Sequence, residues 1–387
     1  MKRITLTVNA HEHQFVVDRD RRLLDILRDD LKLTGAKQSC DRKGQCGACT
    51  VIVDGKTVRS CLTRAENLDG ANVLTIEGLG TPDNPHLIQE AFVLAGAIQC
   101  GFCTPGMILA AKNLLDANPK PTRDEIRHAL RHNLCRCTGY AKIFEAVELA
   151  GRFLRGEVTP AALTPDPNAK QIGVSHPRPW AILKACGLAA FSADVVIPGA
   201  LEIAVVRSPH HRANFLGIDT GKAENMPGVA GIMTAADIKG SNSMGLGQDQ
   251  PMLCTDTLPV LGAPIAIVAA DTREQALAAA AAVEVEYEVL SPMRNAKQAL
   301  AEDAQEVHPG TPNLCHTAGQ IKGDAESAME SAAAVVSGEF YSPLIHQSPL
   351  EPEAAVAYMD GQGEDAQLVV IGRSIQIHAH AQMIQDA

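Results

Sequence analysis

Eight of the eleven cysteines in this 387-residue chain fall into two groups of four, at spacings that can hold iron or zinc. The first group lies within SCDRKGQCGACTVIVDGKTVRSCL and consists of Cys40, Cys46, Cys49 and Cys61. The second comes from QCGFCTPG and NLCRCTGY and consists of Cys100, Cys103, Cys135 and Cys137. Four converging thiolates are the ligand set of a [2Fe–2S] cluster or of a structural zinc ion. Two such sets so close in the chain indicate a short path for electrons.

The spacing of the cysteines favours iron over zinc. Plant-type ferredoxins use C-x4-C-x2-C and a distant fourth cysteine, and the first group here reads C-x5-C-x2-C-x11-C. Zinc ribbons usually pair two CxxC knuckles, whereas each group here has one. The second group combines a CxxC with a tight CxC at a predicted helix end. A zinc-stabilised scaffold without redox activity remains the alternative.

The spacing of apolar residues differs between the segments that surround the two cysteine groups. Residues 1–78 alternate in ITLTVNA, HQFVVD, TVIVDG and VLTIEGL around the helical LLDILRDDL, which predicts a small β-grasp, ferredoxin-like domain. The first group lies after that helix, where Gly44 and Gly47 let backbone amides turn toward the sulfurs. Residues 79–157 contain four amphipathic segments, which predict a helical bundle with the second group at its helix ends. In this bundle Thr122–Glu125 is a capping box, and Pro105 suits a first helical turn.

The rest of the chain reads as a linker and two further segments. Residues 158–179 are rich in proline and lack periodicity, which predicts a linker. Residues 180–310 alternate strands (LEIAVVRS, VAGIMTA, PIAIVAA, VEVEYEVL) with helices (REQALAAAAA, MRNAKQALAED), as an α/β domain does. Residues 311–387 begin a third segment, with predicted strands in AVVSGEFYS, AAVAYMD and AQLVVIG.

The composition limits which partners the protein could bind and in which cellular compartment it could function. A net charge of −11 without a basic face argues against nucleic-acid binding. No apolar run approaches the ~18 residues of a membrane span. The start, MKRITLTVNA, reads as a strand rather than a signal peptide. Because clustered cysteines in a large chain without a signal more often bind metal than form disulfides, we expect a cytoplasmic protein.

The motifs resemble those of a known family. QCGFCTPG followed by LCRCTGY, behind a ferredoxin-like CGAC, resembles the iron–sulfur region of the molybdenum hydroxylases, the xanthine dehydrogenase and aldehyde oxidoreductase family. Beyond the linker, VVRSPHHRANFLGIDTGKAENMPGV and GAPIAIVAADTREQA are similar to the family's a/b hammerhead domain, and HQSPLEPEAAVAYMD resembles the opening of its molybdopterin-binding region. The resemblance implies an α+β multidomain protein with a β-grasp [2Fe–2S] domain, a four-helix [2Fe–2S] bundle, an α/β hammerhead domain and a partial molybdopterin-binding domain.

The resemblance also implies roles. Each cysteine group would ligate one [2Fe–2S] cluster, and Gln99 and Cys137 match positions whose groups contact the pterin in relatives. Electrons would pass from a molybdopterin centre through the second group's cluster to the first, and then to an external acceptor. Since no flavin domain separates bundle and hammerhead, that acceptor would be a separate ferredoxin, flavodoxin or flavin subunit. Arg42 and Lys43 could meet its acidic surface, although two loop charges are often only solvated. The x5 gap departs from the family's x4 and puts the geometry of residues 41–43 in question.

The family's catalytic glutamate and GGxFG-like turn lie well downstream in relatives, and no residue of this chain is nominated as a catalytic base. We therefore expect either a truncated chain or a second polypeptide that completes the molybdenum site. Truncation is favoured because the last residues, HAHAQMIQDA, resemble the opening of a helix with no cap after it. The expected activity is an oxidoreductase acting on aldehydes or N-heterocycles, with aldehydes favoured by analogy. The alternative is a stand-alone two-cluster electron-transfer protein without its own molybdenum site.

The remaining candidates are predicted to be structural. Three further thiols are expected to be buried and unreactive: Cys186, Cys254 and Cys315. Four other side chains are expected to support the fold: His210, His211, His346 and Glu351. In QIHAHA, His378 and His380 would share one face of a strand, with metal binding there a minor alternative.

Overall fold

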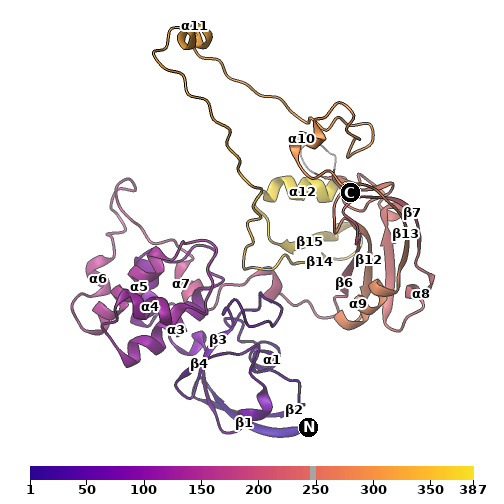
Figure 1. The fold of residues 1–387 in the computed structure, drawn as a ribbon. Coiled ribbons are helices and arrows are strands. Elements are labelled where there is room, and N and C mark those ends of the chain that lie inside the picture. Colours follow the sequence, from indigo (N-terminus) through magenta and orange to yellow (C-terminus); the bar gives the residue numbers. More distant parts are fainter. Residues whose placement is uncertain (245–249) are drawn as a thin grey trace. The chain divides into compact units, whose positions relative to one another are not determined.

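The structure is a computed structural model that describes residues 1–244 and 250–387 (Figure 1). The chain divides by its internal contacts into two compact units. The first unit comprises residues 1–195, 343–355 and 370–373, and the second comprises residues 196–342, 356–369 and 374–387. Within the described residues, no helix is long and apolar enough to cross a membrane.

A five-stranded sheet opens the first unit, in the order β2-β1-β5-β3-β4. Its strands are β1 (Lys2–Val8), β2 (His11–Val17), β3 (Thr50–Val53), β4 (Lys56–Arg59) and β5 (Asn72–Leu74). β1 pairs antiparallel with β2 and parallel with β5, the crossover of a β-grasp sheet. The alternation in β1 buries Ile4, Leu6 and Val8 against α1 (Leu23–Asp25) and the wide turn η1 (Ile26–Asp30). The predicted β-grasp domain is confirmed; the short, polar β4 was missed.

Four helices form the second part of this unit, as predicted. They are α2 (Leu87–Leu94), α3 (Thr104–Ala117), α4 (Arg123–Leu130) and α5 (Ala141–Leu154). Helices α3, α4 and α5 are labelled side by side in Figure 1, and α2 packs on α3 and α5. The predicted capping box is present, because Thr122 Oγ1 accepts from the Glu125 amide and the Glu125 carboxylate accepts from the Thr122 amide. Pro105 lies in the first turn of α3.

Short helices continue the first unit. They are η2 (Ala65–Asn67), η3 (Ile76–Gly78), α6 (Pro160–Leu163), α7 (Ala181–Ala185) and η4 (Ser192–Asp194). Helix α7 buries Ala181 and Ala185 in the same apolar core as α2 and α3. The residues just after the predicted linker therefore fold against the helical bundle.

The second unit is built on two three-stranded sheets, β6-β12-β8 and β11-β7-β13. Their strands are β6 (Glu202–Arg207), β7 (Ala213–Asp219), β8 (Val229–Thr234), β11 (Thr257–Leu258), β12 (Pro264–Ala270) and β13 (Glu284–Val289). The hairpin of β9 (Ser243–Met244) and β10 (Gln250–Pro251) and the helices α8 (Gly221–Glu224), η5 (Ala235–Asp237) and α9 (Arg273–Ala282) complete this part. Ile265 and Val268 of β12 lie in its core, and α9 packs on β6 and β12. All four predicted strands form, and β7 was missed.

The last part of the chain has sparse regular structure. Its elements are α10 (Ala296–Ala299), α11 (Ala325–Glu330), β14 (Ala355–Asp360), η6 (Gly363–Asp365), β15 (Gln367–Gly372) and α12 (Ile377–Asp386). Two predicted strands form the β14-β15 pair, but the strand predicted at residues 334–342 is absent, because no strand within the described residues pairs with that exposed segment. The helix predicted from residue 293 is only one turn, α10. The strand predicted for His378 and His380 is wrong, since both lie on α12, where side chains two apart point in different directions. The helix predicted to open in HAHAQMIQDA is confirmed by α12.

Candidate iron–sulfur sites

The first four cysteines converge around the loop that precedes β3. Cys46, Cys49 and Cys61 are buried, and Cys40 is half-buried. The Cys40 sulfur accepts hydrogen bonds from the backbone amides of Cys46, Gln45 and Gly44. Gly44 and Gly47 have φ of +68° and +69°, the left-handed conformation that glycine adopts most readily. The predicted turning of backbone amides toward sulfur is therefore present at Gly44.

The extra residue of the C-x5-C spacing is accommodated by two left-handed residues. Asp41 has φ of +49° and Arg42 has φ of +59°. Arg42 is held by Asp25, whose Oδ1 lies 2.7 Å from the guanidinium Nη2 and whose side chain is 8% exposed. Both Arg42 and Lys43 are exposed, but Arg42 is paired with Asp25, whereas Lys43 has no ion pair within the residues that the structure describes.

The second four cysteines come from the start of α3 and the loop before α5. Cys103 is buried, Cys100 and Cys135 are half-buried, and Cys137 is exposed. The sulfurs of Cys137 and Cys100 lie 3.5 Å apart. Cys135 contacts the Thr138 hydroxyl at 3.2 Å, and its amide donates to the Tyr140 hydroxyl at 2.9 Å. Thr138 and Tyr140 of the CxCTGY motif therefore fix the loop that presents the last two sulfurs.

The sulfurs in both groups approach one another in pairs. In the first group Cys40 interacts with Cys46, and Cys49 with Cys61. In the second, the pairs are Cys100 with Cys137 and Cys103 with Cys135. Among the described residues, no three His, Cys, Asp or Glu side chains surround one point where a single ion could bind. A pairwise arrangement suits a two-iron cluster, in which each iron takes two protein ligands, better than a tetrahedral zinc.

One thiol in each group is primed to lose its proton. A hydrogen bond from Cys61 lowers the pKa of Cys49 to about 6, and one from Cys103 lowers the pKa of Cys135 to about 5. The pKa values of the two donors, Cys61 and Cys103, are raised in return. Cys49 and Cys135 are therefore the thiols of their pairs that ionise first, whereas Cys61 and Cys103 keep their protons to higher pH.

The two cysteine loops pack directly on each other. The Leu134 amide donates to the Cys46 carbonyl at 2.8 Å, and Leu134 directly precedes Cys135. The buried Asn133 amide donates to the Gly47 carbonyl at 3.0 Å and to Thr50 Oγ1 at 3.1 Å. A Cβ at Gly47 would lie 2.0 Å from the His132 carbonyl oxygen. The sequence pattern did not identify Asn133, because its partners lie in another predicted domain.

An apolar cluster joins the two groups. Cys46 and Phe102 are buried in it with Ala48, and Cys40, Cys100, Phe191 and Leu350 pack against them. The Phe102 and Phe191 rings meet edge to face, with centroids 5.1 Å apart. An aromatic pair at this spacing and angle packs favourably, and it covers part of the surface beside Cys40, Cys46 and Cys100.

Gln99 and Cys137 lie on the exposed side of the second group. Both residues are exposed, and the Gln99 side chain has no hydrogen bond within the described part of the chain. The main-chain carbonyl of Gln99 accepts from Lys184 Nζ at 3.0 Å. The two residues for which the family resemblance implies a pterin contact are therefore accessible to a ligand.

The other sequence candidates lie apart from the sulfurs or in local structure. Cys186 and Cys254 are buried as predicted, and burial raises the pKa of Cys186 to about 11. Cys315 is exposed, which contradicts its prediction, because its segment has no regular structure to cover it. His210 packs edge to face on Tyr287, with centroids 4.9 Å apart, as a structural side chain does.

The residues from His346 to Glu351 belong to the first unit. The Arg136 guanidinium donates to the Gln347 carbonyl at 2.7 Å and to the His346 carbonyl at 3.3 Å. Because Arg136 stands between Cys135 and Cys137, this segment is held against the second cysteine loop. The His346 ring accepts from the Ser348 amide at 2.9 Å. Arg136 was not singled out from the sequence.

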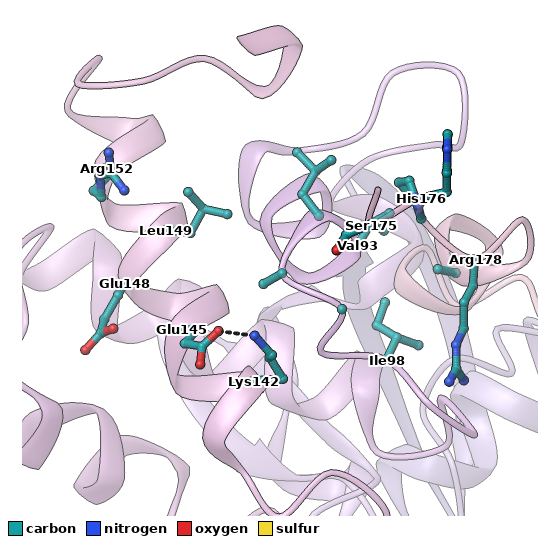
Figure 2. A pocket seen from close by; sticks show the side chains of 15 residues that line it. Val93, Ile98, Lys142, Glu145, Glu148, Leu149, Arg152, Ser175, His176 and Arg178 are labelled. Atoms are coloured by element: carbon teal, nitrogen blue, oxygen red, sulfur yellow. Dashed lines mark hydrogen bonds and ion pairs between the residues drawn. The ribbon is translucent and has the colours of Figure 1, made fainter. Parts of the chain in front are cut away.

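A cavity of about 660 Å³ lies elsewhere in the first unit, between α2, α5 and residues 175–181. Figure 2 shows its charged lining, in which Glu145 is paired with Lys142. Glu148 is paired with Arg123 outside the cavity. None of the eight clustered cysteines lines it, so it is separate from the two sulfur sites.

Four known domain families match the sequence. The 2Fe-2S iron-sulfur cluster binding domain matches residues 6–75, and the [2Fe-2S] binding domain matches residues 75–148. The aldehyde oxidase and xanthine dehydrogenase a/b hammerhead domain matches residues 186–291, and the molybdopterin cofactor-binding domain matches residues 307–387. The predicted fold class is confirmed, as is the prediction of two [2Fe–2S] domains and a molybdopterin-binding region.

Individual relatives agree with these matches. The aldehyde oxidoreductase of Megalodesulfovibrio gigas is 40% identical over 98% of this chain and 43% of its own length. The solved aldehyde oxidoreductase from Desulfovibrio gigas superposes with a TM-score of 0.89 at 39% identity, over 100% of this chain and 44% of its own. The nicotinate dehydrogenase small FeS subunit of Eubacterium barkeri is 50% identical over 38% of this chain and 93% of its own length. The chain thus spans less than half of the aldehyde oxidoreductases that it matches.

Proposed function

Because the chain belongs to the molybdenum hydroxylase family of aldehyde oxidoreductases and xanthine dehydrogenases, we propose that it is the iron–sulfur electron-transfer portion of an oxidoreductase that oxidises aldehydes or N-heterocycles. Residues 1–78 and 79–157 are its two cluster-binding domains in this proposal. The observation that supports this proposal is that the four sulfurs of each cysteine group approach one another in pairs.

The protein ligands are the eight clustered cysteines. One cluster is held by Cys40, Cys46, Cys49 and Cys61, and the other by Cys100, Cys103, Cys135 and Cys137. When bound, a [2Fe–2S] cluster accepts and donates one electron, and molybdopterin supplies the metal centre for substrate oxidation. The chain's own part is to supply thiolates, to direct backbone amides at the sulfurs and to pack the apolar rings of Phe102 and Phe191 beside them.

The contact between the loops supports electron transfer from one cluster to the other. In this proposal Cys46 and Cys135 are ligands of different clusters, and a hydrogen bond from the Leu134 amide to the Cys46 carbonyl joins their loops, with Leu134 bonded directly to Cys135. A short path through covalent and hydrogen bonds allows electrons to pass between two redox centres without a conformational change. In this proposal electrons enter at the second cluster and leave from the first.

The entry side is marked by Gln99 and Cys137, which we propose as the pterin contacts. Both are exposed next to the second cysteine group, and the Gln99 amide is free to bind a ligand. The pterin's heteroatoms would be held by that amide and by the Cys137 residue. The proposal nominates no catalytic base among the residues of this chain.

The exit side is the Cys40–Cys46 loop, which we propose meets a separate ferredoxin, flavodoxin or flavin subunit. Lys43 is exposed there, whereas Arg42 is held by Asp25. An acidic acceptor would be steered by Lys43, and its association would weaken with salt. We place the protein in the cytoplasm, because thiols that bind iron must stay reduced.

Aldehydes are the substrate class that the relatives favour. The proteins that match almost the whole chain are named aldehyde oxidoreductases. Relatives that match the cluster-binding part are named for nicotinate and nicotine, so N-heterocycles stay within the proposal.

The test is the metal content of the anaerobically purified chain, with EPR spectra recorded after dithionite reduction. About four irons per chain and two distinct S = 1/2 signals are expected. Molybdenum that co-purifies with this iron would support a complete site and would direct an aldehyde screen. Zinc without iron would exclude the redox function and leave a zinc-stabilised scaffold.

A stand-alone electron-transfer protein is the second candidate. It is favoured by the separate small FeS subunit of Eubacterium barkeri, whose length is almost fully covered by the cluster-binding part of this chain. Four irons and two signals, with no molybdenum when a molybdopterin-producing host is used, would favour this candidate over the first.

A further inference from the structure

Lys184 lies across the turn that carries Cys100. It belongs to α7, which is anchored by the buried Ala181 and Ala185 and therefore holds the lysine in place. A Cβ at Gly101 would lie 2.5 Å from Lys184 Cδ and 2.8 Å from its Cγ, so the lysine stem rests on this glycine. Gly101 has φ of +88°, a conformation that other residues rarely adopt.

The end of the same side chain binds the other flank of Cys100. Lys184 Nζ donates to the Gln99 carbonyl at 3.0 Å. Gln99 and Gly101 are the two neighbours of Cys100, so one lysine contacts the turn on both sides of a proposed iron ligand. This hydrogen bond fixes the peptide between Gln99 and Cys100, and with it the direction of the sulfur.

The charge of Lys184 has no local counter-ion. Within the described part of the chain, the polar contact of its ammonium is the Gln99 carbonyl, and no carboxylate pairs with it. By contrast, Lys37 beside the first cysteine loop is paired with Asp194 at 2.6 Å. A one-electron reduction adds a negative charge to a cluster, and an unpaired cation nearby stabilises that charge.

We propose that Lys184 is a positioning residue for the second cluster, which fixes the Cys100 turn and raises the reduction potential of that cluster. The inference rests on the proposed function, since it requires a redox cluster at Cys100, Cys103, Cys135 and Cys137. It deepens that function by assigning a role to a residue that lies outside both cluster-binding domains.

The experiment is a dye-mediated redox titration of the full chain, followed by EPR, with three variants of this lysine. K184M removes the charge and the hydrogen bond, K184Q removes the charge but keeps a donor, and K184R keeps both. K142M is the matched control, because Lys142 is a helical lysine of the same bundle whose partner is Glu145. Iron content is measured for every variant.

In K184M and K184Q one of the two EPR signals is expected to shift to lower potential. The ratio of oxidised to reduced cluster at fixed potential should rise severalfold, up to about tenfold, which corresponds to 59 mV for one electron. K184R and K142M should titrate like the unmodified chain. Iron should remain at the level of the unmodified chain in K184Q.

An unchanged potential in an iron-replete K184Q or K184M would overturn the charge-setting role. An equal shift of both signals, or the same shift in K142M, would overturn it as well, because the effect would then be a general one. If K184M loses iron, the comparison of K184Q with K184R still separates the effect of the charge on the potential from an effect of packing. An unmodified chain without iron would instead refute the proposed function, so the two failures are distinguishable.

Discussion

The ammonium of Lys37 lies 2.6 Å from the Asp194 carboxylate, which is 157 residues further along the chain. Both side chains are almost fully buried, and Asp194 Oδ1 also accepts from Arg28 at 2.7 Å. The same ammonium stands 4.6 Å from the centre of the Phe191 ring. Burial lowers the pKa of Lys37 despite the attraction of Asp194. This ion pair ties the segment after α7 to the residues just before Cys40.

Replacement of Asp194 by alanine is expected to destabilise the chain more than replacement of Lys37 by methionine. D194A leaves the two cations Lys37 and Arg28 without their carboxylate, a change that typically costs about 3–5 kcal/mol of unfolding free energy. K37M leaves Asp194 paired with Arg28 and should cost less. Thermal unfolding followed by circular dichroism measures the difference.

The control for this comparison is D116A. Asp116 pairs with Lys112 on the surface of α3, with a side chain that is 57% exposed, and its loss should change stability by less than about 1 kcal/mol. If D194A unfolds at the same temperature as D116A, the buried pair does not hold this segment in place.

Gly47→Ala is expected to abolish binding of iron at both sites. The new Cβ would meet the His132 carbonyl oxygen at 2.0 Å, which forces the two cysteine loops apart. Gly55→Ala is the matched control, because Gly55 has φ of +75° and open space around its Cβ position. Both variants carry the ~1–2 kcal/mol cost of a left-handed alanine, so their difference isolates the clash. Iron content per chain and the visible spectrum report the result; equal iron in the two variants would contradict the packing of the loops.

Asn133→Ala is expected to weaken the same interface without a steric clash. The Gly47 carbonyl and the Thr50 hydroxyl lose their buried donor, which costs about 1–3 kcal/mol. Asn113→Ala is the control, because half-buried Asn113 donates to the Gly55 carbonyl in a hydrogen bond that is exposed at the surface. Faster loss of iron to a chelator in N133A than in N113A is the expected result. Equal rates would mean that the hydrogen bonds of Asn133 do not hold the loops together.

The convergence of the cysteines in two groups could be predicted from the sequence, because the cysteines of each group are close in the chain and their spacing is chemically specific. The helices of the bundle followed from apolar residues at helical spacing, and Thr122 marked a helix start through local chemistry. The pairing of Lys37 with Asp194 and the contact of Lys184 with Gly101 leave no such local pattern. They arise when distant segments pack, so periodicity cannot show them.

The wrong secondary-structure predictions also arose because contacts between distant segments leave no local pattern in the sequence. Residues 334–342 have the composition of a strand, but a strand forms only where a partner strand supplies hydrogen bonds. The alternating His378 and His380 suggested period two, while the apolar positions of α12 follow the helical period. The short strand β4 was missed because its polar residues lie at the sheet edge, where burial imposes no alternation.

Arg42 and Lys43 are expected to act differently although they are neighbours in the lengthened cysteine loop. Arg42 is tied to Asp25, and this contact supports a loop with two left-handed residues. R42A should therefore speed the loss of iron from the first cluster severalfold. The effect on overall stability should stay within about 1 kcal/mol, because the Arg42 side chain is 47% exposed.

K43A should leave iron binding unchanged and slow electron transfer to an acidic ferredoxin or flavodoxin, with a weaker dependence on salt. Chelator kinetics and stopped-flow oxidation at two ionic strengths separate the two effects. If both variants change iron loss equally, the contact between Asp25 and Arg42 does not support the loop, and if K43A retains the full salt dependence, Lys43 does not steer the acceptor.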